Sequence, residues 1–230
     1  MKRNILLNPG PATTTDSVKQ ALMVPDICPR EQEFGDLTQS VLKKVVQVVN
    51  GNLTHSAVIF AGSGTAGVEA ALSSVVAPDG KILILDNGAY GKRAETIIQA
   101  YGISHRTYRI GWGEYPDVAE IESIFQQDRE LTHFAFVHHE TTTGMLNPLP
   151  ELLELCQKYE VDSIVDAMSS YAGLPIDLQE LPIDYLISSS NKCIQGMAGT
   201  SFVIANNEKL AKTAKFPARN LYLNLWGNHS

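Results

Sequence analysis

The hydrophobic residues of the chain gather in short runs that are rich in valine, isoleucine and phenylalanine. The runs are nearly continuous, which is typical of strands covered on both faces, because a strand with one wet face alternates apolar and polar residues. We expect six strands, at residues 57–61, 81–85, 134–138, 163–167, 184–188 and 201–205.

Segments with a helical pattern separate these runs. Their apolar residues recur at i, i+3 and i+4, the spacing that places them on one face of a helix. Strands that alternate with helices form a mostly parallel sheet with helices on both faces, a three-layer αβα arrangement. Ligands bind such sheets beyond the carboxyl ends of the strands, so functional residues should directly follow strands. We expect these helices at residues 67–76, 91–101, 117–127 and 150–159.

The two ends of the chain fit this alternation less well. Prolines break residues 1–55 before a helical segment near residues 38–49, and we interpret these residues as an N-terminal arm followed by one helix. Residues 56–215 form the predicted large domain, with its last helix at residues 208–215. Residues 216–230 follow that helix without a pattern that predicts a terminating element.

Composition says more about which kinds of partner this protein can bind than about its fold. The 230 residues carry 18 Lys and Arg against 25 Asp and Glu, a net charge of -7 with no basic run, which argues against a nucleic-acid partner. No apolar stretch approaches the roughly 20 residues that span a bilayer, so we expect no membrane partner and a cytoplasmic protein. Three cysteines without a paired spacing favour free thiols, and they predict neither a disulfide framework nor a metal site.

A glycine-rich turn at residues 62–67 follows the first predicted strand and opens the first predicted helix. Small residues there let backbone N–H groups and the hydroxyls of Ser63 and Thr65 converge on an anion, and the helix dipole favours a phosphate. The spacing matches neither a P-loop, which needs Gly-Lys-Ser/Thr, nor the GxGxxG dinucleotide fingerprint. The turn therefore predicts a phosphate site without predicting a nucleotide.

Two ionisable residues follow other predicted strands. Asp166 lies near the end of the strand at residues 163–167, where a buried carboxylate needs a cation or hydrogen-bond donors. Lys192 comes after the strand at residues 184–188, among small polar residues. A lysine amine, a phosphate anchor and a strand-end carboxylate are together what pyridoxal 5′-phosphate (PLP) requires, because the carboxylate keeps the ring nitrogen protonated.

Five segments carry a resemblance to a known family: LNPGP at residues 7–11, GSGTAGVEA at 62–70, HHETTTG at 138–144, DAMSS at 166–170 and SNK at 190–192. They resemble segments of the class V aminotransferases of fold type I. The resemblance covers essentially the whole chain and implies the large domain of that fold, PLP as cofactor, small-molecule substrates and a homodimer. The residues of HHETTTG and DAMSS are similar to those of the branch that moves the amino group of 2-aminoethylphosphonate to pyruvate, which gives phosphonoacetaldehyde and alanine in phosphonate catabolism.

The resemblance also implies a role for each matching residue. Lys192 would form the Schiff base with PLP and move the substrate proton, and Asp166 would pair with the ring nitrogen. The other implied contacts are Ser63, Gly64, Thr65 and Asn191 to the phosphate, Tyr90 stacked on the ring, Thr141 near the ring hydroxyl, and Asn8, Pro9 and Gly10 of the arm to the substrate.

Other interpretations stay open. An alanine:glyoxylate or serine:pyruvate aminotransferase would keep the cofactor and change the substrates. In the resembled family a small C-terminal domain supplies an arginine to the substrate. We expect residues 216–230 to begin the connection to that domain and the domain itself to be absent here. Arg219, the only arginine after Arg129, precedes the expected domain. Such a chain could instead be an inactive PLP-binding or subunit-interaction module. A cysteine desulfurase is less favoured, because that branch stacks a histidine where this sequence has Tyr90.

Overall fold

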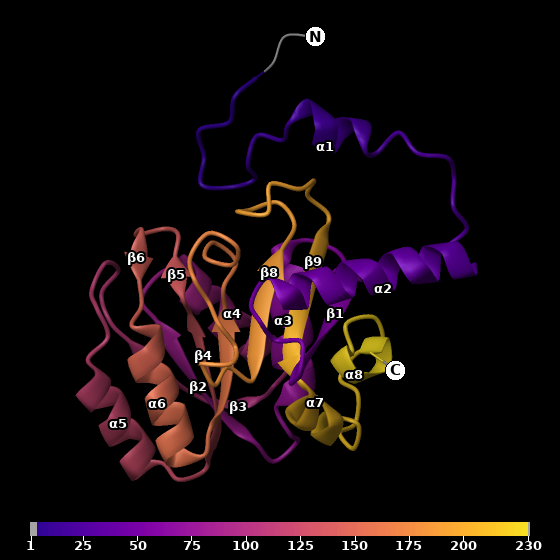
Figure 1. The fold of residues 1–230 in the computed structure, drawn as a ribbon. Helices are drawn as coiled ribbons and strands as arrows, with labels where there is room; N and C mark the ends of the chain where they lie inside the picture. The colour runs from indigo at the N-terminus through magenta and orange to yellow at the C-terminus, as the bar shows by residue number, and fades with distance from the viewer. Residues whose placement is uncertain (1–3, 230) are drawn as a thin grey trace.

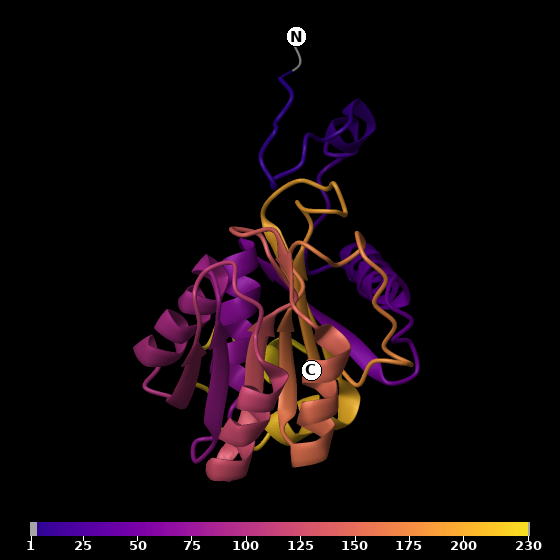
Figure 2. The same ribbon diagram turned by 90° about the vertical axis from the view of Figure 1, so that its left-hand side faces the viewer.

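The computed structural model describes residues 4–229 and shows one large sheet covered by helices on both faces (Figure 1, Figure 2). Within these residues the sheet has seven strands in the order β1-β9-β8-β7-β4-β2-β3. β9 runs antiparallel to both of its neighbours, and every other neighbouring pair is parallel. The strands are β1 (His55–Ala61), β2 (Lys81–Asp86), β3 (Ser104–Arg109), β4 (Leu131–Val137), β7 (Asp162–Asp166), β8 (Tyr185–Ser189) and β9 (Thr200–Asn206).

Two groups of helices cover the two faces of the sheet, and each group closes a separate apolar core. Side chains of β2 alternate between these cores, with Leu83 and Leu85 in one and Ile82 and Ile84 in the other, all fully buried. This double burial explains why the apolar runs are continuous. One face carries α2 (Gln32–Gln47), α5 (Val118–Gln127) and α6 (Leu149–Tyr159), and the other carries α3 (Gly64–Val75), α4 (Ala89–Ala100), α7 (Asn207–Thr213) and α8 (Leu225–His229).

The predicted three-layer, mostly parallel sheet is confirmed, while several small elements were not predicted. β3 is an edge strand whose polar side chains stay partly exposed, so it lacks an apolar run. A hairpin of β5 (His139–Glu140) and β6 (Met145–Leu146) has two residues in each strand, too few to show a period. α1 (Asp16–Gln20) is a single short turn in the arm and buries none of its residues.

The prediction that residues 216–230 lack a terminating element is wrong. α8 packs against α3 and β1, and its Leu225 is fully buried. Arg219 donates hydrogen bonds to the carbonyl oxygens of Ser73 and Val76, at 2.9 and 2.7 Å, where α3 ends. A five-residue helix is stable because of such tertiary contacts and not because of its own propensity, so its sequence carries little signal.

The arm, residues 4–31, lies beyond the ends of β8 and β9 (Figure 1). Its backbone is anchored there, because the Ala12 N–H donates to the Asn191 carbonyl oxygen at 3.0 Å. The arm therefore covers the edge of the sheet at which the predicted functional residues follow their strands. Among residues 4–229, no helix has both the length and the apolar character that crossing a bilayer would require.

Candidate active site

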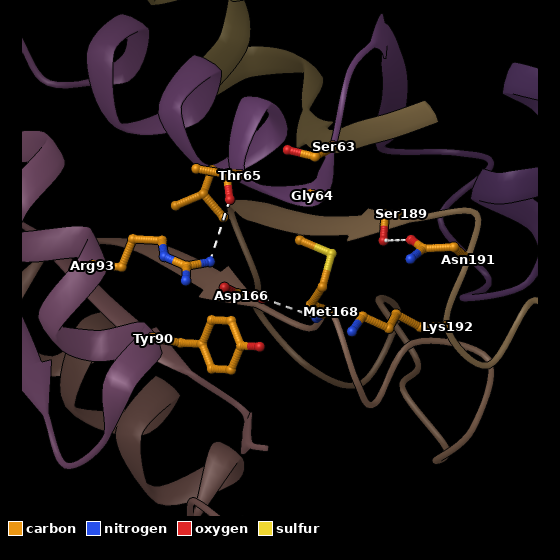
Figure 3. Close-up of a pocket in the computed structure, with 11 residues that line it drawn as sticks. Ser63, Gly64, Thr65, Tyr90, Arg93, Asp166, Met168, Ser189, Asn191 and Lys192 are labelled. Atoms are coloured by element: carbon orange, nitrogen blue, oxygen red, sulfur yellow. Dashed lines mark hydrogen bonds between the residues drawn. The ribbon is translucent and has the colours of Figure 1, made fainter. Parts of the chain in front are cut away.

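A cavity of about 180 Å³ opens at the carboxyl ends of the central strands (Figure 3). Its walls come from the turn after β1, the first turns of α4, the end of β7 and the loop after β8. Segments far apart in the sequence thus meet at one edge of the sheet, as a parallel sheet requires. The residues with predicted roles that line it are Ser63, Gly64, Thr65, Tyr90, Asp166, Asn191 and Lys192.

The start of α3 forms one wall of this cavity. Ser63 is the N-cap residue, its side chain caps no N–H group of the helix, and the first turn contains no acidic residue. Gly64 lies so close to Met168 that an added Cβ would approach the Met168 Sδ to 2.6 Å. The helix therefore presents N–H groups, the hydroxyls of Ser63 and Thr65 and a positive dipole end, an arrangement that binds an anion.

Asp166 closes the deep end of the cavity at the last residue of β7. Its Oδ1 accepts a hydrogen bond from the Met168 N–H at 2.9 Å. Burial raises the pKa of the Asp166 carboxyl to about 6, and the charge of Glu140 acts in the same direction, while the charges of Arg93 and Lys192 act against it. Within residues 4–229 its carboxylate has no ion-pair partner within 4.0 Å.

Lys192 and Asn191 reach the cavity from the loop after β8. The Asn191 Oδ1 accepts from the Ser189 hydroxyl at 2.8 Å, which orients the amide group (Figure 3). The Lys192 side chain packs against the arm, because a Cβ at Gly10 would lie 2.5 Å from the Lys192 Nζ. Only a residue without a side chain permits this close approach between the arm and the amine.

Tyr90 and Arg93 extend from one face of α4, three residues apart. The Arg93 guanidinium lies 5.0 Å from the centre of the Tyr90 ring, and its Nη1 donates to the Thr65 hydroxyl at 3.3 Å (Figure 3). Arg93 thus links Tyr90 to the turn that begins α3. Arg93 was not among the predicted site residues, because a single arginine in a helix has no pattern that marks it as functional. Its position three residues after Tyr90 places it on the same face of the helix.

Thr141 lines a smaller neighbouring cavity together with Tyr90, Asp166 and Lys192. Its hydroxyl forms a hydrogen bond of 2.5 Å with the hydroxyl of Ser169. Sequence reasoning assigned no role to Ser169, nor to Met168 and Ser189, which line the larger cavity.

The remaining predicted contacts, in the arm, divide into two groups. Gly10 touches Lys192, as described, and is half-buried. Asn8 and Pro9 are exposed and line neither of the two cavities. The structure therefore brings one of the three arm residues to the lysine.

Comparison with known proteins identifies the family. The model of the aminotransferase class-V family matches residues 21–218. The chain belongs to this family. A 2-aminoethylphosphonate–pyruvate transaminase of Klebsiella pneumoniae is 46% identical over 223 residues, and one of Salmonella paratyphi C is 43% identical over the same length. Each alignment covers 96% of this chain and 60% of the relative, so the chain spans 60% of the length of these curated relatives.

Solved aminotransferase structures share the fold. An alanine–glyoxylate aminotransferase from Nostoc sp. has a TM-score of 0.90 and 28% identity, over 97% of this chain and 59% of the other. A pyridoxamine–pyruvate aminotransferase from Mesorhizobium loti has a TM-score of 0.88 and 24% identity, over 100% of this chain and 60% of the other. The second likeness concerns the fold alone. Together they confirm the predicted PLP-dependent aminotransferase fold.

PLP is the cofactor of class V aminotransferases, and the cavity fits it on three counts. The start of α3 suits a phosphate, since no side chain caps its N–H groups. The Asp166 carboxyl, without an ion-pair partner, suits a protonated ring nitrogen. The Lys192 amine lines the same space. Bound PLP supplies an electron sink that makes the proton on a substrate carbon removable.

Proposed function

We propose that this chain carries the cofactor site of a PLP-dependent transaminase that moves the amino group of 2-aminoethylphosphonate to pyruvate. The products are phosphonoacetaldehyde and alanine, so an amine and a carbonyl oxygen exchange places without an added oxidant. The observation that carries the proposal is the 43% to 46% identity, over 96% of the chain, to relatives named for this reaction. Transfer from alanine to glyoxylate has weaker support, at 28% identity.

In this proposal, Lys192 and Asp166 have different tasks. The Lys192 Nζ would hold PLP covalently and, as a free amine, would take the proton from the substrate carbon. The Asp166 carboxylate would hold the ring nitrogen in its protonated form. A cation beside its carboxylate favours the ionised form, which lowers its pKa from the value of about 6 that burial produces.

The other predicted residues hold and enclose the ligands. The support is the position of five of them around one cavity, the position of Thr141 in the smaller cavity beside it, and the contact of Gly10 with Lys192. A 2-oxo acid and a phosphonate are both anions, and the arm lies where it could close over them. In the proposal, Ser63, Gly64, Thr65 and Asn191 bind the phosphate, Tyr90 packs on the ring, Thr141 bonds the ring hydroxyl, and Asn8, Pro9 and Gly10 contact the substrate.

The absorbance spectrum of the purified chain with PLP tests this function. We expect a visible band from bound PLP, loss of that band when 2-aminoethylphosphonate is added, and its return with pyruvate. Lys192→Ala should remove the band and the turnover. A chain that binds PLP but responds to no amine would overturn the aminotransferase proposal in favour of an inactive binding module. Turnover with alanine and glyoxylate, but not with 2-aminoethylphosphonate, would overturn the proposed substrates.

The proposal includes a homodimer in the cytoplasm. Large apolar side chains on the arm support a partner subunit, since Leu7, Leu22 and Met23 are 95%, 61% and 80% exposed. The three free cysteines of the described chain suit a reducing compartment. Light scattering that finds only monomer would contradict the dimer, and recovery from a membrane or extracellular fraction would contradict the location.

A further inference from the structure

Glu140 is a fully buried carboxylate that meets the first turn of α4, the helix that carries Tyr90. Its Oε2 accepts a hydrogen bond from the backbone N–H of Tyr90 at 3.2 Å. Gly88, the N-cap residue of α4, offers no side chain of its own for this purpose. A Cβ at Gly88 would lie 2.3 Å from the Glu140 Cδ, so the glycine leaves the space that the carboxylate fills.

The second carboxylate oxygen of Glu140 is linked to the same helix by hydrogen bonds through Thr142. Oε1 accepts from the Thr142 N–H at 3.2 Å and from its hydroxyl at 2.5 Å. That hydroxyl in turn accepts from the N–H of Ala89 at 3.3 Å. The first two N–H groups of α4 are therefore both bonded to Glu140, that of Tyr90 directly and that of Ala89 through the Thr142 hydroxyl. The dipole of the helix favours a negative charge at this end.

A separate link holds the β5–β6 hairpin to the loop before α4. The Asn87 Nδ2 donates to the Asn147 Oδ1 at 2.8 Å, and the Asn147 Nδ2 donates to the Val137 carbonyl oxygen at 2.7 Å. Both asparagines are buried. Because this link does not involve Glu140, loss of the carboxylate should loosen the start of α4 without detaching the hairpin.

We propose that Glu140 is a positioning residue, which caps α4 from the hairpin and so holds the Tyr90 ring in place for PLP. This inference rests on the proposed function, since PLP is the ligand that the ring meets. A buried carboxylate is tolerated only where donors replace its water, and here the donors are the Tyr90 N–H of α4 and the N–H and hydroxyl of Thr142, whose hydroxyl also accepts from the Ala89 N–H of α4. The role of Glu140 is thus to act through Tyr90 and not to touch the substrate.

Equilibrium titration of the cofactor-free chain with PLP tests this role. We expect Glu140→Ala to weaken PLP binding about tenfold, the scale of one lost aromatic contact. Tyr90→Leu should weaken it by a similar factor. The double variant should lose little more than either single one, because both changes remove the same contact. A loss of about a hundredfold in the double variant, the product of independent effects, would overturn the inference, as would unchanged binding in Glu140→Ala.

Two further variants separate positioning from folding. In Gly88→Ala the added methyl group displaces the Glu140 side chain from its place beside α4, so PLP binding should weaken as it does in Glu140→Ala. This variant tests the role even if Glu140→Ala fails to fold. Asp117 caps α5, away from both cavities, by accepting from the N–H of Ala119 at 2.8 Å. Asp117→Ala should lower stability and leave PLP affinity unchanged. Weaker PLP binding in Asp117→Ala, matching that of Gly88→Ala, would reduce Glu140 to a structural residue.

A measurement without cofactor keeps this inference distinct from the proposed function. Amide hydrogen exchange at Ala89 and Tyr90 should be slow in the cofactor-free wild-type chain and should quicken at least tenfold in Glu140→Ala and in Gly88→Ala. Unchanged exchange would overturn the positioning role whatever the chain binds. A wild-type chain with slow exchange that binds no PLP would overturn the proposed function, while the cap itself would stand.

The charge of Glu140 has a second effect that a neutral variant isolates. Its repulsion contributes to the raised pKa of Asp166. Glu140→Gln keeps an acceptor for the Tyr90 N–H but removes the charge, so Asp166 should stay ionised to lower pH. The acid limb of the PLP-binding profile should therefore move to lower pH in this variant, with binding at neutral pH weakened less than in Glu140→Ala. An unmoved or oppositely moved limb would contradict the electrostatic part of the inference.

Discussion

The two ends of β7 hold acidic residues in opposite electrostatic surroundings. Asp162, at its start, shares Lys209 with Asp184, whose carboxylate also accepts from the Ser163 N–H at 2.8 Å. Asp166, at its end, has no ion-pair partner among the described residues and accepts from the backbone at Met168. One strand thus carries an ion-paired carboxylate at one end and an uncompensated one at the other.

This difference separates stability from binding. The ion-paired end has a cation within the protein, so removing that cation should weaken the fold. The open end lacks a cation, and burial makes its negative charge unfavourable until one binds. Three changes, taken from the largest expected effect to the smallest, would break or sharpen the contrast.

Lys209→Met should have the largest effect. It keeps the apolar stem but leaves Asp162 and Asp184 without their cation, so we expect a loss of about 2 kcal/mol of unfolding free energy at pH 7, less than for a fully buried pair because the amine is partly exposed. Urea unfolding of the cofactor-free chain measures it. Lys212→Met, at an exposed position of the same helix, is the control. Equal losses in both variants would contradict the predicted role of the ion pair.

Asp166→Asn should raise the free energy of unfolding, the opposite of the effect of Lys209→Met. The folded pKa of about 6 lies above the unfolded value of about 4, so stability falls as the pH rises from about 4, and the full loss is reached above pH 6. We expect the variant to gain about 1–2 kcal/mol in the cofactor-free state at pH 7.5, and the gain to vanish near pH 4. Asp162→Asn, on the same strand, should lose stability at pH 7.5. A loss in both variants would remove the contrast.

His133 at the ion-paired end should give the smallest effect. Burial lowers the pKa of its imidazole to about 4, against the opposing charge of Asp162. Since this folded pKa lies below the unfolded value, stability is lost as the pH falls from about 6.5 towards 4, and we expect about 1 kcal/mol of that loss by about pH 6. His133→Gln should flatten this slope in urea unfolding. An imidazole that titrates near pH 6.5 by nuclear magnetic resonance would contradict the prediction.

The sequence predicts the open end of the sheet well. Apolar runs buried on both faces are visible without tertiary information, and Ser63 and Lys192 follow such runs. Because the carboxyl ends of parallel strands share one edge, their convergence on a cavity follows from the order of elements. The polar edge strand β3 and the short helix α8 lack such runs, and each depends on contacts with distant residues.

The candidate site shows the same limit. Helical spacing predicts that Arg93 lies on the same face as Tyr90, so Arg93 was predictable once Tyr90 had been chosen. Glu140 was not, although it stands in the HHETTTG segment, because its role depends on a hairpin whose strands have two residues each. A carboxylate that caps a helix about 50 residues earlier in the chain leaves no local pattern.

The place of β9 between β1 and β8 also bears on how the protein is made. Within the described chain, β1 pairs only with β9, where Ala61 meets Thr200, and the N–H of Gly62 donates to the Gly199 carbonyl oxygen at 2.8 Å. The anion-binding turn therefore leaves the ribosome long before the strand that fixes it. Nascent chains that end before β9 should hold most of the parallel sheet and still capture no cofactor.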